Sequence, residues 1–239
     1  MYRLMRKTAA AVVFCCVLPG VSSARTHGYR LSKPRAGQGA VQRFVAAPLE
    51  WPRREVLDLA MRAYRCGQAE GEFESTILTV IDYSLPSTEK RLWVIDLAKG
   101  QVLFHELVAH GQNSGEAYAV DFSNRPESRQ SSLGLFRTDD VYEGGHGESL
   151  RLIGLEPGIN DRAEERRIVM HGAAYVNPRV VQRFGQLGRS WGCPAVDPAV
   201  LPRIVRRIKE GTALFAYYPD PRWLRQSRFL QCDGNLAAK

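Results

Sequence analysis

The sequence predicts a mainly β, α+β fold in which a largely antiparallel sheet is flanked by a few helices. Most of its patterned segments are short runs of β-branched and aromatic residues separated by turn residues. Apolar residues recur at helical spacing in only three places. We find no internal repeat or low-complexity tract, and a chain of roughly 190 residues after the N-terminal region suffices for one domain with a sizeable core.

The N-terminus has the pattern of a secretory signal peptide. Arg3, Arg6 and Lys7 precede a short apolar run, and small residues at 22–24 form a cleavage site. The run is shorter than the ~20 residues that a membrane-spanning helix needs. We therefore expect residues 1–24 to be removed and the protein to be exported, to the periplasm or cell envelope, without stable membrane insertion.

Two further segments are predicted by composition. Residues 25–47 are basic, contain glycine and lack apolar periodicity, which predicts a flexible linker. Residues 48–239 are expected to form a single domain. Its first element is a helix over 48–68, with Pro52 in the first turn and Gly67 at the end.

The rest of the domain is dominated by strand patterns. The expected strands at 90–97 and 101–110 are joined by the turn Ala98-Lys99-Gly100, which predicts a hairpin. Two long polar connections, 111–132 and 142–152, are candidate functional loops. The remaining expected elements are strands at 75–83, 133–138, 149–155, 167–171 and 212–218 and helices at 178–184 and 198–209.

The charge is moderately positive. The full chain has a formal net charge of +8, and removal of residues 1–24 takes away three positive charges and no negative ones. The remaining excess suits an anionic envelope polymer. We find no zinc-finger spacing, RNA-binding signature or dense basic helix, so nucleic acid is not an expected partner.

The number of cysteines limits how they can pair in disulfides. Cys15 and Cys16 lie in the signal peptide, which leaves Cys66, Cys193 and Cys232 in the mature chain. An odd number in an oxidising compartment means that at least one thiol stays free or bridges another chain. The sequence allows three single pairings, or none, and it leaves the oligomeric state open.

The segment "GRSWGCPAV" places Cys193 where it could be a nucleophile. Asp197 is a good N-cap and Pro198 suits a first helical position, which predicts a helix beginning shortly after the cysteine. The dipole of such a helix would lower the pKa of the thiol. Gly192 would let a substrate approach closely, and the amides of Trp191, Gly192 and Cys193 are candidate donors to an oxyanion.

A nucleophilic thiol needs a base, and three histidines are candidates. His171 ends a strand-like run, precedes a glycine and lies 22 residues before Cys193. His110 has the same setting in "LVAHG", and His146 in "GGHGE" could reach a substrate from a mobile loop. These residues leave open a catalytic Cys–His pair and a structural cysteine. A zinc site built from them matches no usual ligand spacing, so no metal is predicted.

The paired segments "HGAAYV" and "LGRSWGCPAV" resemble the motif of the L,D-transpeptidase catalytic domain family, a His-Gly followed after a spacer by Ser/Thr-His-Gly-Cys. The wider text "FSNRPESRQSSLG", "HGESLRLIGLEPGIND" and "IVMHGAAYV" is similar to the murein L,D-transpeptidase catalytic-domain-like branch. The resemblance covers residues 55 to 218. It implies an L,D-transpeptidase-like antiparallel β-sandwich with a few flanking helices, and makes 48–239 a catalytic domain.

The resemblance also implies roles for individual residues. Cys193 would be the nucleophile and His171 the base, with the Gly172 carbonyl orienting its ring. Trp191 stands where the family usually has His, so it either walls the acyl pocket or packs as an ordinary aromatic. Pro194 stands where the family often has a basic or polar residue. The implied oxyanion or substrate-binding residues are Gly172, Ser190, Trp191, Gly192 and His146.

The implied substrate is a peptidoglycan stem peptide. Cys193 would form a thioester with the carbonyl of a diamino acid and pass it to an amine acceptor, without a metal or organic cofactor. Transfer to water would make the protein an L,D-carboxypeptidase, and an amidase could use the same Cys–His site. The alternative from another class is an envelope-binding domain that has lost the chemistry. Donor and acceptor specificity stay open.

Overall fold

The computed structural model describes residues 49–145 and 147–232. The predicted signal peptide (1–24) and linker (25–47) lie outside these ranges. The strands are β1 (Ile77–Asp82), β2 (Leu92–Asp96), β3 (Gln101–Glu106), β4 (Gly134–Gly144), β5 (Gly147–Gly154), β6 (Val169–Gly172), β7 (Ala195–Val196) and β8 (Ala213–Tyr217). The helices are α1 (Arg54–Ala69), the 3-10 turn η1 (Gln112–Ser114), α2 (Pro178–Phe184), α3 (Leu201–Ile208) and α4 (Pro221–Gln226).

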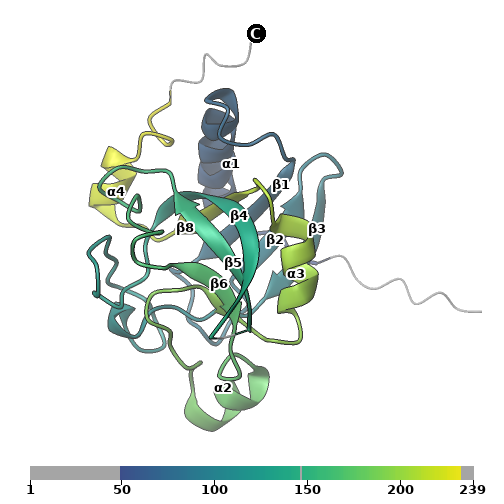
Figure 1. Ribbon diagram of the computed structural model, residues 1–239, viewed down its shortest axis with the longest axis vertical. Helices are drawn as coiled ribbons and strands as arrows, with labels where there is room; N and C mark the ends of the chain where they lie inside the picture. The colour runs from purple at the N-terminus through teal and green to yellow at the C-terminus, as the bar shows by residue number, and fades with distance from the viewer. Residues whose placement is uncertain (1–48, 146, 233–239) are drawn as a thin grey trace, which may run out of the picture. The chain divides into compact units, whose positions relative to one another are not determined.

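All eight of these strands belong to one sheet, in the order β3-β2-β1-β8-β4-β5-β6-β7 (Figure 1). Most neighbours are antiparallel, and β1–β8 and β6–β7 are the parallel pairs among the described strands. The predicted hairpin is β2–β3, where Gly100 has a φ of +59° and the Lys99 N–H donates to Asp96 Oδ1 at 3.1 Å. The mainly β class with flanking helices is therefore confirmed.

The first helix differs at both ends from the prediction. It begins at Arg54, so Pro52 precedes the N-cap instead of lying in the first turn. It also runs past Gly67 to Ala69. A Cβ on Gly67 would lie 2.7 Å from the Phe73 ring, so this glycine permits close packing and does not end the helix.

Two helices bury apolar stripes against the sheet. In α3, Leu201, Ile204, Val205 and Ile208 are all buried, which is the i, i+3, i+4, i+7 pattern of a helix with one face in the core. The helix α1 does the same with Val56 and neighbours one turn apart. Truncating one of these large side chains to Ala would cost about 2–5 kcal/mol.

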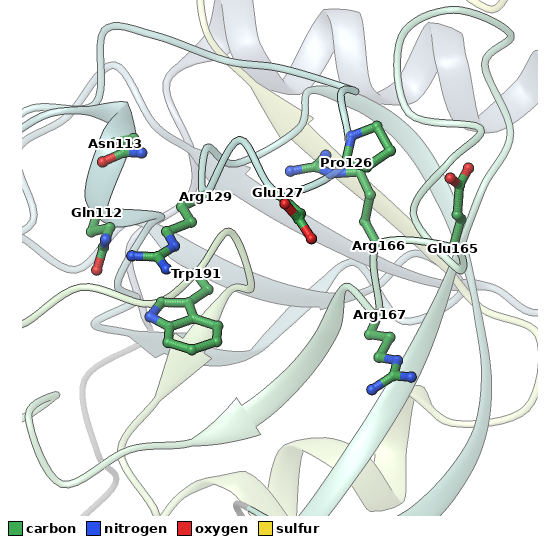
Figure 2. Close-up of a pocket in the computed structure, with 9 residues that line it drawn as sticks. All are labelled: Gln112, Asn113, Pro126, Glu127, Arg129, Glu165, Arg166, Arg167 and Trp191. Carbon is green, nitrogen blue, oxygen red and sulfur yellow. The ribbon is translucent and has the colours of Figure 1, made fainter.

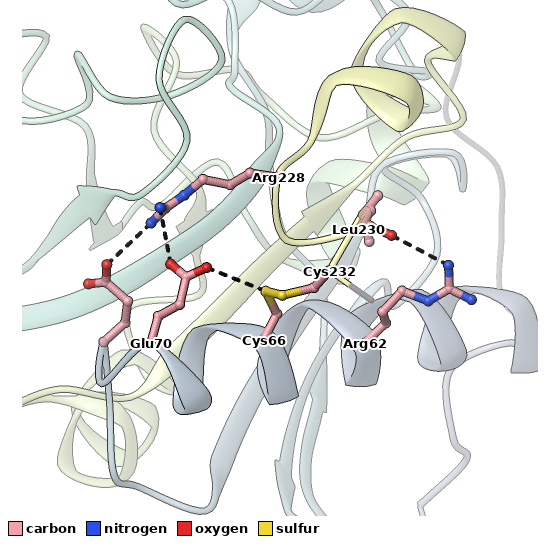
Figure 3. The surroundings of a disulfide bond; sticks show 7 residues. Arg62, Cys66, Glu70, Arg228, Leu230 and Cys232 are labelled. Carbon is pink, nitrogen blue, oxygen red and sulfur yellow. Dashed lines mark hydrogen bonds and ion pairs between the residues drawn. A yellow bond between two sulfur atoms is a disulfide. The ribbon is translucent and has the colours of Figure 1, made fainter. Parts of the chain in front are cut away.

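A disulfide joins the first helix to the end of the described chain. Cys66 on α1 is bonded to Cys232, with their Cα atoms 6.0 Å apart (Figure 3). Beside it, Arg228 forms an ion pair with Glu70 at 3.0 Å, and Arg62 donates to the Leu230 carbonyl at 3.4 Å. The bridge closes a long loop of the unfolded chain, which contributes a few kcal/mol in the chain-entropy model. Of the pairings open to the sequence, this one occurs.

The short helix α4 was not predicted, because six residues are too few to show a periodicity. Asp220 caps it by accepting from the Trp223 N–H at 2.7 Å. Trp223 is buried and its indole N–H donates to Glu156 at 3.3 Å. None of the helices in the described ranges is long and apolar enough to cross a membrane.

Candidate functional site

The segment that carries Cys193 runs between two neighbouring segments and is hydrogen-bonded to both. On one side the Ser190 N–H donates to the His110 carbonyl at 2.9 Å. On the other side the His171 N–H donates to the Pro194 carbonyl at 3.3 Å, within the parallel β6–β7 pair. His110 and His171 therefore both lie on segments directly adjacent to the cysteine segment. This adjacency could not be predicted from the sequence.

Cys193 is the free cysteine among residues 49–145 and 147–232. Its half-buried Sγ lies 3.6 Å from the Arg167 carbonyl, just before β6. Burial raises the pKa of the thiol, and the Val169 N–H and the Arg166 guanidinium act in the opposite direction. The net result is a pKa above the ordinary value of a cysteine.

The helix predicted over 198–209 begins three residues later than expected, and the pKa of Cys193 is raised instead of lowered. The strand β7 follows the cysteine, and a turn follows β7, in which Asp197 Oδ1 accepts from the Ala199 N–H at 2.9 Å. The helix α3 begins only at Leu201, with Val200 as its N-cap. Asp197 therefore caps a turn instead of the helix, because pairing with β6 keeps residues 195–196 extended.

His171 lies in β6, where its main chain is in register with Ala195 of β7 and Ser149 of β5. The residue is 4% exposed, and Nδ1 of its ring lies 3.1 Å from the Gly172 carbonyl. A carbonyl can only accept, so Nδ1 carries the proton and the neutral ring has its lone pair on Nε2. The contact with Gly172 that the resemblance implied is present.

His110 is in the opposite situation. The residue is 1% exposed, and Nδ1 of its ring lies 2.7 Å from Nη2 of the buried Arg91. A guanidinium can only donate, so Nδ1 accepts and Nε2 holds the proton, 3.3 Å from the Gly115 carbonyl. Burial, and then the charge of Arg91, lower the pKa of His110 to about 4. The lone pair of this ring is thus bound to Arg91.

The loop around Cys193 is held by its own polar groups. The Gly192 N–H donates to Ser190 Oγ at 3.1 Å, and this hydroxyl donates to the Cys193 carbonyl at 2.6 Å. Gly192 has a φ of +125°, and a Cβ there would lie 2.8 Å from the Gln130 carbonyl. Gly192 and Ser190 therefore shape this loop, and the candidate oxyanion donors narrow to the amides of Trp191 and Cys193.

Ser131 was missed by the sequence analysis. Its hydroxyl accepts from the Gly111 N–H at 3.0 Å and donates to the Gly192 carbonyl at 3.0 Å, which joins the two segments on one side of the site. Its N–H donates to Ser114 Oγ at 2.8 Å. The only sequence signal was its place in the polar connection 111–132, one of the two predicted functional loops.

A groove of about 810 Å³ lies beside the cysteine segment, with Trp191 among its lining residues (Figure 2). Trp191 is 69% exposed and forms part of its wall, with the guanidinium of Arg129 4.7 Å above its ring. Arg167 contributes its side chain to the groove and its carbonyl to the contact with Cys193 Sγ. The groove is lined by Gln112, Asn113, Pro126, Glu127, Arg129, Glu165, Arg166, Arg167 and Trp191.

The remaining candidate, His146, lies outside the described residues. Within the described ranges, one group of three potential ligands has its donor atoms within 4.8 Å of one another: Cys66, Glu70 and Cys232. Its two sulfurs are joined in the disulfide, so this group cannot act as a thiolate metal site.

A family model described as L,D-transpeptidase catalytic domain matches residues 50–217. Comparison with curated proteins gives no match. An L,D-transpeptidase from Mycobacterium smegmatis is similar, with 15% identity over 60% of this chain and 59% of that chain and a TM-score of 0.37. The helical cell shape determining protein Pgp2 from Campylobacter jejuni has 10% identity over 71% of this chain and 58% of that chain, with a TM-score of 0.41.

This chain thus spans less than two thirds of the length of these two solved structures. The family model, in contrast, covers well over half of the chain, including both His171 and Cys193. The resemblance stated from the sequence is therefore confirmed, and the chain belongs to the L,D-transpeptidase catalytic domain family.

Proposed function

We propose that this protein is an exported peptidoglycan L,D-transpeptidase in which Cys193 is the nucleophile and His171 the base. The observation that supports this most is the pairing of β6 with β7, which brings His171 next to the segment of the free cysteine. The Nδ1–Gly172 contact supports it further, because it keeps the basic lone pair on Nε2. Neither a metal nor an organic cofactor is needed.

The proposed reaction has two halves. His171 takes the proton of the Cys193 thiol, and the thiolate attacks the carbonyl of the stem-peptide diamino acid. The amides of Trp191 and Cys193 face the developing oxyanion. When the tetrahedral intermediate collapses, the C–N bond breaks, the departing amine takes the proton from His171, and a thioester remains.

The second half decides the product. An acceptor amine attacks the thioester, its proton passes through His171 back to sulfur, and a new amide cross-link forms. Attack by water instead would give an L,D-carboxypeptidase. The groove beside Trp191 supports transfer, because it provides room for a second peptide beside the cysteine segment.

The test is mass spectrometry of stem-peptide substrates incubated with the mature protein, residues 25–239. Cross-linked dimers that have lost the residue after the diamino acid would support transpeptidation, and trimmed monomers would support the carboxypeptidase. Unchanged peptides that nevertheless bind would favour an envelope-binding domain.

Cys193→Ala should abolish turnover with little change in the midpoint of thermal unfolding. Cys193→Ser should also be nearly inactive, because a hydroxyl does not readily form the anion that a thiol forms. The mechanism would be rejected by full activity of the Ala variant, or by peptide mapping that finds Cys193 bridged to another cysteine in active protein.

A further inference from the structure

The guanidinium of Arg166 is held by four neutral acceptors. Nη1 donates to the Ser123 carbonyl at 2.6 Å and to Ser132 Oγ at 2.5 Å. Nη2 donates to the Gln130 carbonyl at 2.6 Å and to Ser128 Oγ at 3.1 Å. None of these partners is a carboxylate, and within the described ranges Arg166 takes part in no ion pair. Its position is therefore fixed by neutral groups, and although Glu127 and Glu165 line the same groove, neither forms an ion pair with it in the described ranges.

This cation lies against the residue that precedes the nucleophile. Arg166 Nη2 is 3.4 Å from the place that a Cβ on Gly192 would occupy, and the Gln130 carbonyl is 2.8 Å from the same place. A side chain at position 192 would displace one or both groups. The chain from Arg166 continues through Arg167, whose carbonyl is the contact of Cys193 Sγ.

The thiol needs such a cation because burial disfavours its anion. The helix that could have supplied positive charge begins only at Leu201. Arg166, Tyr83 and Tyr175 are titratable groups that interact electrostatically with the thiol. His171 lies on the neighbouring strand, and the groove beside Trp191 also holds Glu127, Arg129, Glu165 and Arg167. The pKa of both tyrosines is raised to about 12, chiefly by burial, so both are neutral at pH 7. Of Arg166 and these two tyrosines, Arg166 alone carries a permanent positive charge.

We propose that Arg166 is a positioning residue that stabilises the Cys193 thiolate by its charge and so sets the pH range in which the nucleophile forms. The inference rests on the proposed function for its role in turnover. The stabilisation itself is a property of the thiol and can be measured without any peptide substrate.

The experiment is the rate of alkylation of Cys193 by iodoacetamide as a function of pH, in the oxidised mature protein. The Cys66–Cys232 disulfide leaves Cys193 as the thiol that reacts. Arg166→Gln should raise the midpoint of the profile by about one pH unit, which means about tenfold less thiolate at neutral pH. Arg166→Lys retains the charge and should keep the midpoint near that of the wild type.

Arg162→Gln is the matched control, because Arg162 is an exposed arginine of the same segment. Its side chain is paired with Glu165 at 3.9 Å. Its profile should match the wild type. An unchanged midpoint in folded Arg166→Gln would overturn the proposal, as would an equal rise in the Lys variant or the control. If the Gln variant does not fold, the Lys variant decides, since a rise of about one unit there contradicts a charge effect.

The two proposals can fail separately. A raised midpoint in Arg166→Gln together with a wild type that leaves stem peptides unchanged would reject the proposed function and retain the role of Arg166. Normal turnover by the wild type with no shift in Arg166→Gln would reject only the role of Arg166.

Discussion

The cysteine segment is flanked by two copies of the same dipeptide, His110-Gly111 on one side and His171-Gly172 on the other. Both rings are buried, and both backbones pair with the segment of Cys193. The two sites differ in the group that faces Nδ1, which is a guanidinium at His110 and a carbonyl at His171. The proton therefore lies on opposite ring nitrogens in the two histidines.

This difference separates a structural from a candidate catalytic histidine. Arg91 is fully buried and donates to the carbonyls of Val108 and Leu85 as well as to His110. Burial lowers its pKa to about 10. His110 supplies the acceptor that this buried cation needs, and it cannot use the same lone pair to take a proton. The local sequence "His-Gly" carries none of this information.

The largest expected effect comes from substituting Gln for His171, and the same substitution at His110 is the comparison. His171→Gln should lower turnover about 10²–10⁴-fold, because a carboxamide cannot take the thiol proton. His110→Gln should leave the chemical step almost unchanged, because the amide can accept from Arg91 and donate to the Gly115 carbonyl. The measurement is single-turnover formation of the acyl-enzyme at saturating substrate.

The two variants control each other, since each replaces one ring by the same side chain beside the same segment. Loss of the chemical step in His110→Gln with normal rates in His171→Gln would mean that the roles of the two sites are reversed.

The sequence predicted the fold well because its elements have local signals. The hairpin β2–β3, the strands β1, β5 and β8 and the buried face of α3 all follow from β-branched and aromatic runs, turn residues or helical spacing. The family motif also pointed to His171 and Cys193, which lie on two segments that the fold brings together. The errors fell where tertiary pairing overrides a local signal, as at Asp197, where a turn follows the paired strand β7 and α3 begins only at Leu201.

The groups around the site could not be predicted in the same way. Arg91, Ser131 and Arg166 reach it from segments 19 to 102 positions away from His110 or Cys193, and they have no motif of their own. Their types, a serine in a polar loop and two of many arginines, are common on surfaces. What distinguishes them is burial or a contact across the fold, and a single sequence records neither.

A smaller effect is expected in the pH dependence of stability. The pKa of His110 is about 4 in the folded protein and about 6.5 in the unfolded chain. Between these values the unfolded chain binds a proton that the folded protein does not, so the free energy of unfolding falls as the pH drops from 6.5 to 4. The loss is about 3 kcal/mol. Urea unfolding at several pH values measures it.

His110→Gln should remove that part of the pH dependence, because the residue no longer titrates. The comparison between the two histidines would have to be revised if the variant kept the full slope between pH 4 and 6.5. A folded-state pKa of His110 near 6.5 by NMR would contradict it directly.

The smallest expected effect is the difference in stability between Gly111→Ala and Gly172→Ala. A Cβ on Gly111 would lie 2.5 Å from the Arg129 carbonyl and 2.9 Å from Gly192 Cα, both of them backbone atoms that cannot rotate away. Gly111→Ala should cost about 1–3 kcal/mol in the free energy of unfolding and lower turnover by displacing the residue next to Cys193. A Cβ on Gly172 meets Pro198 Cα at 3.1 Å, which a shift of a few tenths of an ångström relieves. Gly172→Ala should therefore cost less than about 1 kcal/mol. Urea unfolding and turnover of both variants measure the contrast, and equal losses would mean that the two segments pack equally tightly against the cysteine loop.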